Sequence, residues 1–151
     1  MKLRMVPPFN EYGVLPEGVH DSTLEEVEER FGRFQSSDRR SILFAKFRRF
    51  VAEAKACRSV EELLLDGSFV TAKADPNDID LVVVVLGARA LGADLQPDEY
   101  NVLSKKRVRS RFGFDILLAR AGTDEVTQTA DFFCQVRPRP DLRKGMVRIR
   151  L

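Results

Sequence analysis

Residues 65–81 read Leu-Asp-Gly-Ser-Phe-Val-Thr-Ala-Lys-Ala-Asp-Pro-Asn-Asp-Ile-Asp-Leu, and no other stretch of the chain says more about its fold. The Gly67-Ser68 pair is followed, after nine residues, by the acidic alternation Asp78-Ile79-Asp80. The second acid leads directly into an unbroken apolar run, which predicts a buried strand over Ile79–Leu86. Because alternate residues of a strand point to the same face, the carboxylates of Asp78 and Asp80 are predicted to lie side by side.

Two carboxylates at the open end of a core strand either hold a hard divalent cation or simply face water. Mg²⁺ binds through one or two carboxylates together with the phosphate oxygens of a substrate. Asp78 and Asp80, about 6–7 Å apart along a strand, are close enough for both to lean toward one pair of ions. Gly67 permits a sharp turn, and the free N–H groups of a short helix beginning at Ser68 suit a triphosphate.

This segment resembles the signature of the nucleotidyltransferase superfamily typified by DNA polymerase beta, in its small bacterial minimal form. The signature is a hydrophobic residue, Gly, then Gly or Ser, a short spacer, Asp, a hydrophobic residue, Asp or Glu, and another hydrophobic residue. The residues that match it in order and spacing are Gly67, Ser68, Asp78, Ile79, Asp80 and Leu81. The resemblance implies an α/β (α+β) fold, in which helices pack on a mixed β-sheet that carries the site.

The resemblance also implies a third carboxylate from a neighbouring strand, and Asp115 is the candidate because apolar residues flank it. On this interpretation Asp78, Asp80 and Asp115 are catalytic and hold two Mg²⁺ (or Mn²⁺) ions. Asp115 would also help to activate the hydroxyl group of the acceptor. Three converging carboxylates repel one another unless cations are present, which favours metal binding over a chance grouping.

The Gly-Ser turn is expected to cradle the β- and γ-phosphates of the nucleotide through Gly67 and Ser68. Lys73 lies in the loop between the turn and the carboxylates, where it either reaches a phosphate as a point charge or is a solvated lysine. Asp66 departs from the family pattern, because a hydrophobic residue usually precedes the glycine. This extra anion is expected to weaken triphosphate binding.

More of the chain, from about Pro7 onward, is similar to a branch of small nucleotidyltransferase-like proteins with little established biochemistry. The residues that carry this likeness are Val6–His20, the wording around Gly67–Val82, and the ending Asp131-Phe132-Phe133 with Lys144–Ile149. The implied activity is transfer of a nucleoside monophosphate from an NTP to a protein hydroxyl or an RNA end, with release of pyrophosphate. The implied setting is a toxin–antitoxin or phage-defence system, in which a separate protein is the toxin or the acceptor.

Two alternatives from other classes stay open at this point. A catalytically inactive nucleotidyltransferase fold would bind and restrain a partner protein as an antitoxin or regulator. A nucleic-acid-binding module would use the basic clusters without chemistry, although solvated faces of helices and a strand are the favoured explanation of each cluster. The clusters comprise Arg39, Arg40, Lys46, Arg48 and Arg49, then Lys105, Lys106, Arg107, Arg109 and Arg111, and finally Arg137, Arg139, Arg143, Lys144, Arg148 and Arg150.

Composition is consistent with one globular domain over residues 1–151, with 44% hydrophobic and 32% charged residues. No apolar run approaches the roughly 20 residues that span a bilayer, so we expect no membrane association. The start of the chain lacks the apolar segment of a secretory signal, and Cys57 and Cys134 lack metal or redox spacing. We therefore expect a cytoplasmic protein with free thiols.

The remaining elements, apart from residues 60–66, follow from periodicity and capping signals. Residues 60–66 are ambiguous, because Ser59 and Glu62 mimic the capping box of a helix, and the resemblance implies a strand there before the Gly-Ser turn. Residues 1–20 are expected to form an irregular arm and residues 87–92 a loop. The last two strands are expected to pair as a C-terminal β-hairpin closed by residues 137–145. The predicted helices span residues 21–31, 37–56, 69–72, 97–109 and 124–130, and the predicted strands span residues 60–66, 79–86, 114–119, 132–136 and 146–151.

Overall fold

The computed structural model describes residues 6–33, 38–86, 94–136 and 139–151, and the predicted loop over residues 87–92 lies outside them. Its centre is a five-stranded mixed sheet in the order β1-β7-β2-β3-β4, which confirms the predicted α/β class. In chain order these strands are β1 (Val19–Ser22), β2 (Val60–Asp66), β3 (Asp80–Val85), β4 (Asp115–Arg120) and β7 (Met146–Arg150). The helical segments are α1 (Leu24–Val27), the π-helical turn η1 (Glu28–Gly32), α2 (Asp38–Cys57), the 3-10 turn η2 (Ser68–Val70), α3 (Tyr100–Leu103), α4 (Lys105–Phe112) and α5 (Asp124–Phe133).

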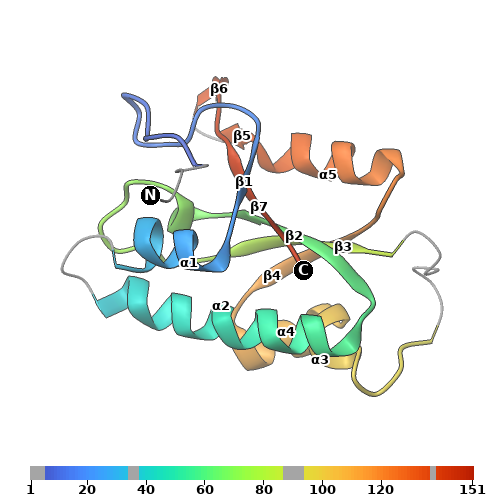
Figure 1. The fold of residues 1–151 in the computed structure, drawn as a ribbon. Helices are drawn as coiled ribbons and strands as arrows, with labels where there is room; N and C mark the ends of the chain where they lie inside the picture. Colours follow the sequence, from blue (N-terminus) through green and yellow to red (C-terminus); the bar gives the residue numbers. More distant parts are fainter. Residues whose placement is uncertain (1–5, 34–37, 87–93, 137–138) are drawn as a thin grey trace.

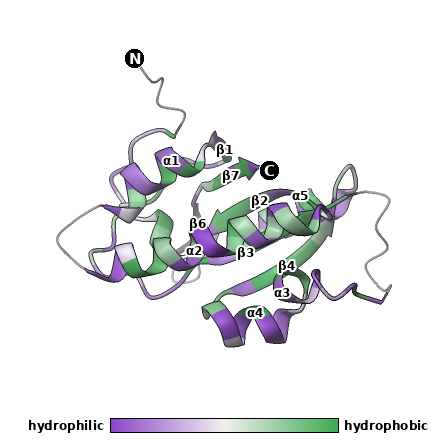
Figure 2. Ribbon diagram, turned by 60° about the horizontal axis from the view of Figure 1, so that its bottom comes forward, coloured by the Kyte–Doolittle hydropathy of each residue, from purple (hydrophilic) through white to green (hydrophobic). Residues whose placement is uncertain are grey.

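Helices cover both faces of this sheet (Figure 1). The alternation of β3 divides its apolar residues between the two sides: Leu81, Val83 and Val85 join the larger core, whereas Val82 and Val84 join the smaller one. The larger core is closed by α2 with α3 and α4, and the smaller core by α5, which packs on β3 and β4. Figure 2 shows the hydrophobic residues along β2 and β4 and the hydrophilic residues over α4.

Strand pairing in the sheet brings the ends of three strands together. β2 runs antiparallel to β3 and to β7, while β3 runs parallel to β4 and β1 parallel to β7. As a result, the last residue of β2 and the first residues of β3 and β4 meet at one edge of the sheet. These residues are Asp66, Asp80 and Asp115.

The predicted C-terminal hairpin is wrong. Residues 146–150 form β7, which inserts between β1 and β2 in the main sheet rather than pairing with residues 132–136. Phe132 and Phe133 belong to α5, and the short strand β5 (Gln135–Val136) pairs instead with β6 (Arg139–Arg143). The alternation of Val147 and Ile149 with Arg148 and Arg150 suits a strand with one buried face, and in the main sheet Val147 and Ile149 join the larger core.

Two smaller differences concern helices and the N-terminal arm. The helix predicted over residues 97–109 is two helices, because Ser104 leaves helical geometry and caps α4 by accepting from the N–H of Arg107. The arm ends in a strand, β1, and its residue Leu15 packs into the larger core. Among the described helices, none combines the length and apolar character that a bilayer-spanning segment requires.

Candidate active site

Three aspartates form a row across the neighbouring ends of β2, β3 and β4. Asp66 on β2 is the register partner of Asp80 on β3, and Asp80 is the register partner of Asp115 on β4. Neighbouring strands lie about 4.8 Å apart, so each carboxylate is one strand from the next. Alternation places all three on the α5 side of the sheet, the side to which Val82 also points.

The predicted Gly-Ser turn is present beside this row. Gly67 has φ 93° and ψ 179°, a backbone region that only glycine occupies without strain. A side chain there would place its Cβ 3.0 Å from the carbonyl oxygen of Asp78 and 3.1 Å from the backbone nitrogen of Asp80. The sequence therefore needs glycine at this position both for conformation and for space, and the turn leads directly into η2.

Asp78 lies just before β3 and faces the turn. Its Oδ1 accepts hydrogen bonds from the backbone N–H of Ser68 at 2.8 Å and from the hydroxyl of Ser68 at 2.5 Å. The backbone N–H of Asn77 in turn donates to Ser68 Oγ at 3.0 Å. The carboxylate of Asp78 thus occupies the donors that the sequence assigns to a phosphate, and the turn behaves as an anion site already filled from within.

Asp80, the central member of the row, is the most perturbed acid of the site. Burial, followed by the charges of Asp78, Asp66 and Asp115, raises its pKa to about 6 against a lowering effect of Lys144. Desolvation and like charge both disfavour an ionised carboxylate. A cation placed here would remove that penalty, which is the electrostatic condition expected of a metal site or of a group that binds protons.

The negative charge of Asp66 is offset by a residue that the sequence does not single out. Its side chain is buried, and Lys144 Nζ lies 3.2 Å from Asp66 Oδ1 as an ion pair outside hydrogen-bond geometry. Burial raises the pKa of Asp66, whereas the neighbouring Lys144 lowers it. The pair removes the physical reason for expecting Asp66 to repel a triphosphate, because the extra negative charge is largely offset.

Asp115 closes the other end of the row. Arg109 Nη1 of α4 contacts Asp115 Oδ1 as an exposed ion pair, and the carboxylates of Asp115 and Asp80 both raise the pKa of Arg109. The turn after α4 brings the two together, since Gly113 adopts the left-handed conformation that ends the helix two residues before Asp115. Arg109 was predicted only as one member of a basic cluster.

Lys73 is exposed, and its own side chain does not reach the aspartate row in any described contact. Its carbonyl oxygen is held instead by Arg40, a residue of α2 with no exposed surface. The Arg40 guanidinium donates to the carbonyls of Phe31 (3.0 Å), Phe69 (2.6 Å), Thr71 (2.7 Å) and Lys73 (2.6 Å). Burial lowers the pKa of Arg40 to about 10, so the group stays charged near neutrality and fastens the segment that follows the Gly-Ser turn.

The donor set of this site fits a hard divalent cation in its chemistry, because carboxylate oxygens are the ligands that Mg²⁺ and Mn²⁺ prefer. Within the described residues, no three His, Cys, Asp or Glu side chains are already arranged as a metal site. Two of the three predicted ligands are engaged elsewhere, Asp78 with Ser68 and Asp115 with Arg109. Asp80 would hold a cation with Asp115 once Arg109 moves aside, and with Asp78 once Ser68 releases it.

The chain belongs to the DUF6932 family, described as a family of unknown function, whose sequence profile matches residues 7–150. No curated protein and no solved structure matches the chain.

Proposed function

We propose that this protein is a metal-dependent nucleotidyltransferase, which moves a nucleoside monophosphate from an NTP to a hydroxyl group of a protein or RNA acceptor. The observation that carries the proposal is the row of aspartates beside the glycine turn. Asp80 and Asp115 are register partners on adjacent strands, and the donors of Ser68 lie on the loop that connects β2 to β3. Acids and anion-binding donors at one edge of a sheet are the two groups that a metal–triphosphate needs.

The residues of the chain take separate roles in this proposal. The backbone N–H and hydroxyl of Ser68 bind phosphate oxygens in place of Asp78, and Gly67 lets the chain approach them closely. Asp78, Asp80 and Asp115 hold one or two Mg²⁺ (or Mn²⁺) ions, which when bound would neutralise charge on the reacting phosphates. The exposed carboxylate of Asp115 would accept the proton of the acceptor hydroxyl as its oxygen bonds to the α-phosphorus, and the bond from that phosphorus to the β-phosphate oxygen would break to release pyrophosphate. Lys73 is proposed to reach the outer phosphates from its exposed position in the loop.

A label-transfer assay tests this function. The protein is incubated with each α-labelled NTP, with Mg²⁺ or Mn²⁺, and with cell lysate that supplies protein and RNA acceptors. We expect label on an acceptor, and loss of that label to background in Asp80→Ala and Asp78→Ala. The matched control is Asp98→Ala, an exposed aspartate near Cys57 and Ser59 at the opposite end of β2. Absence of transfer with every nucleotide and both metals contradicts the proposal.

The second candidate is a catalytically inactive fold that binds and restrains a partner protein. The observation that favours it is the internal pairing of the site, in which Asp78 fills the Ser68 donors and Arg109 pairs with Asp115. Such a site would need neither metal nor nucleotide. Tight, metal-independent binding of a partner without label transfer supports this candidate, and the resemblance to toxin–antitoxin and phage-defence proteins indicates where a partner gene is to be sought.

A further inference from the structure

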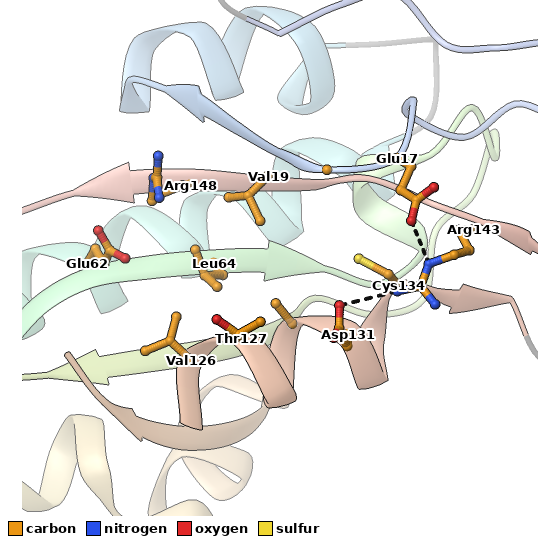
Figure 3. Close-up of a pocket in the computed structure, with 12 residues that line it drawn as sticks. Glu17, Val19, Glu62, Leu64, Val126, Thr127, Asp131, Cys134, Arg143 and Arg148 are labelled. Carbon is orange, nitrogen blue, oxygen red and sulfur yellow. Dashed lines mark hydrogen bonds and ion pairs between the residues drawn. The ribbon is translucent and has the colours of Figure 1, made fainter. Parts of the chain in front are cut away.

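A pocket opens on the same side of the sheet as the aspartate row (Figure 3). It has a volume of about 270 Å³ and lies between α5 and the strands β1, β2 and β7. Its apolar walls come from Val19, Leu64 and Val126, with Ala130 and Cys134 beside them. The pocket lies open between these elements because α5 packs on β3 and β4 rather than over this part of the sheet.

The rim of this pocket is polar and carries more acids than bases. Glu17 and Asp131 lie at one end, where Arg143 forms ion pairs with them at 2.8 Å and 3.4 Å, and Figure 3 shows Glu62 and Arg148 at the other. Arg148 is already paired with Asp21, a residue that does not line the pocket, at 2.6 Å. Glu62 is paired with Arg150 at 3.9 Å, so each rim carboxylate has a cationic partner, and their remaining oxygens can accept hydrogen bonds from N–H and O–H donors.

The pocket adjoins the aspartate row. Leu64 of its wall is one same-face step along β2 from Asp66, a distance of about 7 Å. At the Cys134 end, the carbonyl oxygen of Cys134 accepts from the backbone N–H of Lys144 at 2.8 Å, and the Lys144 ammonium contacts Asp66. A molecule lying across this junction would reach from the apolar pocket to the carboxylates without leaving the sheet face.

We infer that this pocket binds the nucleoside end, base and ribose, of the NTP whose phosphates bind at Ser68. The inference rests on the proposed function and adds the position and character of the base subsite. A nucleobase has two apolar faces and polar edges, which suits apolar walls with a few hydrogen-bonding groups at the rim. The acceptor oxygens of the rim carboxylates favour bases with amino groups over uracil, and the phosphates are left to the Gly-Ser turn.

Nucleosides without phosphate are the probes that separate this inference from the catalytic proposal. Guanosine, adenosine, cytidine and uridine are titrated into the ¹⁵N-labelled protein, and the amide shifts are followed by NMR. We expect saturable shifts at the amides of Leu64, Val126 and Ala130, stronger for the amino-bearing nucleosides than for uridine. Ser68→Ala is expected to leave these shifts unchanged, since the probes carry no phosphate.

Three variants of α5 make the test specific. Thr127 is exposed and lines the pocket, so Thr127→Trp fills the pocket without replacing a core residue and is expected to weaken nucleoside binding about tenfold or more. The matched control is Gln128→Trp, because the neighbouring Gln128 is exposed and does not line the pocket. Asp131→Asn is expected to weaken the binding of the amino-bearing nucleosides and to leave the affinity for uridine unchanged.

The outcomes separate the two proposals. Nucleoside binding that Thr127→Trp abolishes, without label transfer under any condition, supports the pocket and contradicts the enzyme. Label transfer that Thr127→Trp leaves unchanged, or nucleoside shifts outside the pocket, overturns the pocket and leaves the enzyme standing. Stronger pocket shifts from tyrosine amide than from every nucleoside also overturn the inference, because the hollow would then receive an acceptor side chain.

Discussion

Replacing Arg40 is expected to destabilise the protein strongly, because one buried guanidinium serves four backbone carbonyls. In Arg40→Met the carbonyls of Phe31 and Phe69, whose bonds to Arg40 are buried, lose their donor. Each buried acceptor without a partner costs about 1–3 kcal/mol, so the two together cost about 2–6 kcal/mol. The carbonyls of Thr71 and Lys73 are only partly buried, and water replaces the donor there.

The cost of burying the guanidinium offsets part of this loss, which is why the lower half of the range is expected. A decrease of about 2–4 kcal/mol in the free energy of unfolding corresponds to a Tm lower by about 4–16 °C in a domain of this size. Arg40→Lys keeps the charge, but its compact ammonium does not span four carbonyls, so an intermediate loss is expected. The loop after the Gly-Ser turn should loosen in both variants.

Urea unfolding followed by circular dichroism measures the free energy, and a thermal scan measures Tm. The matched control is Arg39→Met on the same helix, where the side chain is exposed. Hydrogen exchange at residues 69–73 reports whether the loop itself has opened. If Arg40→Met is as stable as Arg39→Met, the four hydrogen bonds do not stabilise the fold and the reasoning is refuted.

Three further predictions concern the site itself. Gly67→Ala should lower the free energy of unfolding by about 1–3 kcal/mol or more, measured in urea, whereas Gly122→Ala, also at positive φ but with nothing within 4 Å of its Cβ, should cost less. Asp80→Asn should be more stable than the wild type above about pH 6 by about 1–2 kcal/mol, after allowance for solvent screening. Because the folded pKa of Asp80 is raised, this advantage should disappear below the unfolded value of 3.8, as unfolding across pH will reveal. Arg109→Ala should raise the affinity for Mn²⁺, measured by calorimetry, while Arg107→Ala, whose Nε donates to Asn101, should not change it.

The strands that build the site are predictable from the sequence because local pattern and tertiary position agree there. The apolar run after Asp80 leaves no alternative to a buried strand, and the structure has β3 over Asp80–Val85. Asp115 was placed from a short apolar segment of the next strand, and the register pairs it with Asp80. Gly67 was assigned to a turn for its conformational freedom, and its φ of 93° bears this out.

The partners of these acids were not predictable, because each comes from a distant segment whose position only the fold determines. Lys144 reaches Asp66 because β7 enters the sheet next to β2, a pairing that no local pattern favours over a hairpin. Arg40 sits among basic residues on α2, and its burial depends on the packing of η1 and η2 against that helix. A basic residue in a basic cluster carries no local signal of burial.

The site has a consequence for how ligands would enter it. Its anion donors at Ser68 are occupied by an internal anion, Asp78, and its acid Asp115 by an internal cation, Arg109. A nucleotide alone would displace Asp78 and add negative charge beside Asp80, whose pKa is already raised by its neighbours. A divalent cation alone would compete with Arg109 and find Asp78 still bound to the turn. A metal–nucleotide complex exchanges both internal partners at once, because its phosphate replaces Asp78 at Ser68 and its cation receives the released carboxylate. The two ligands should therefore bind with positive coupling, each raising the affinity for the other by the same factor.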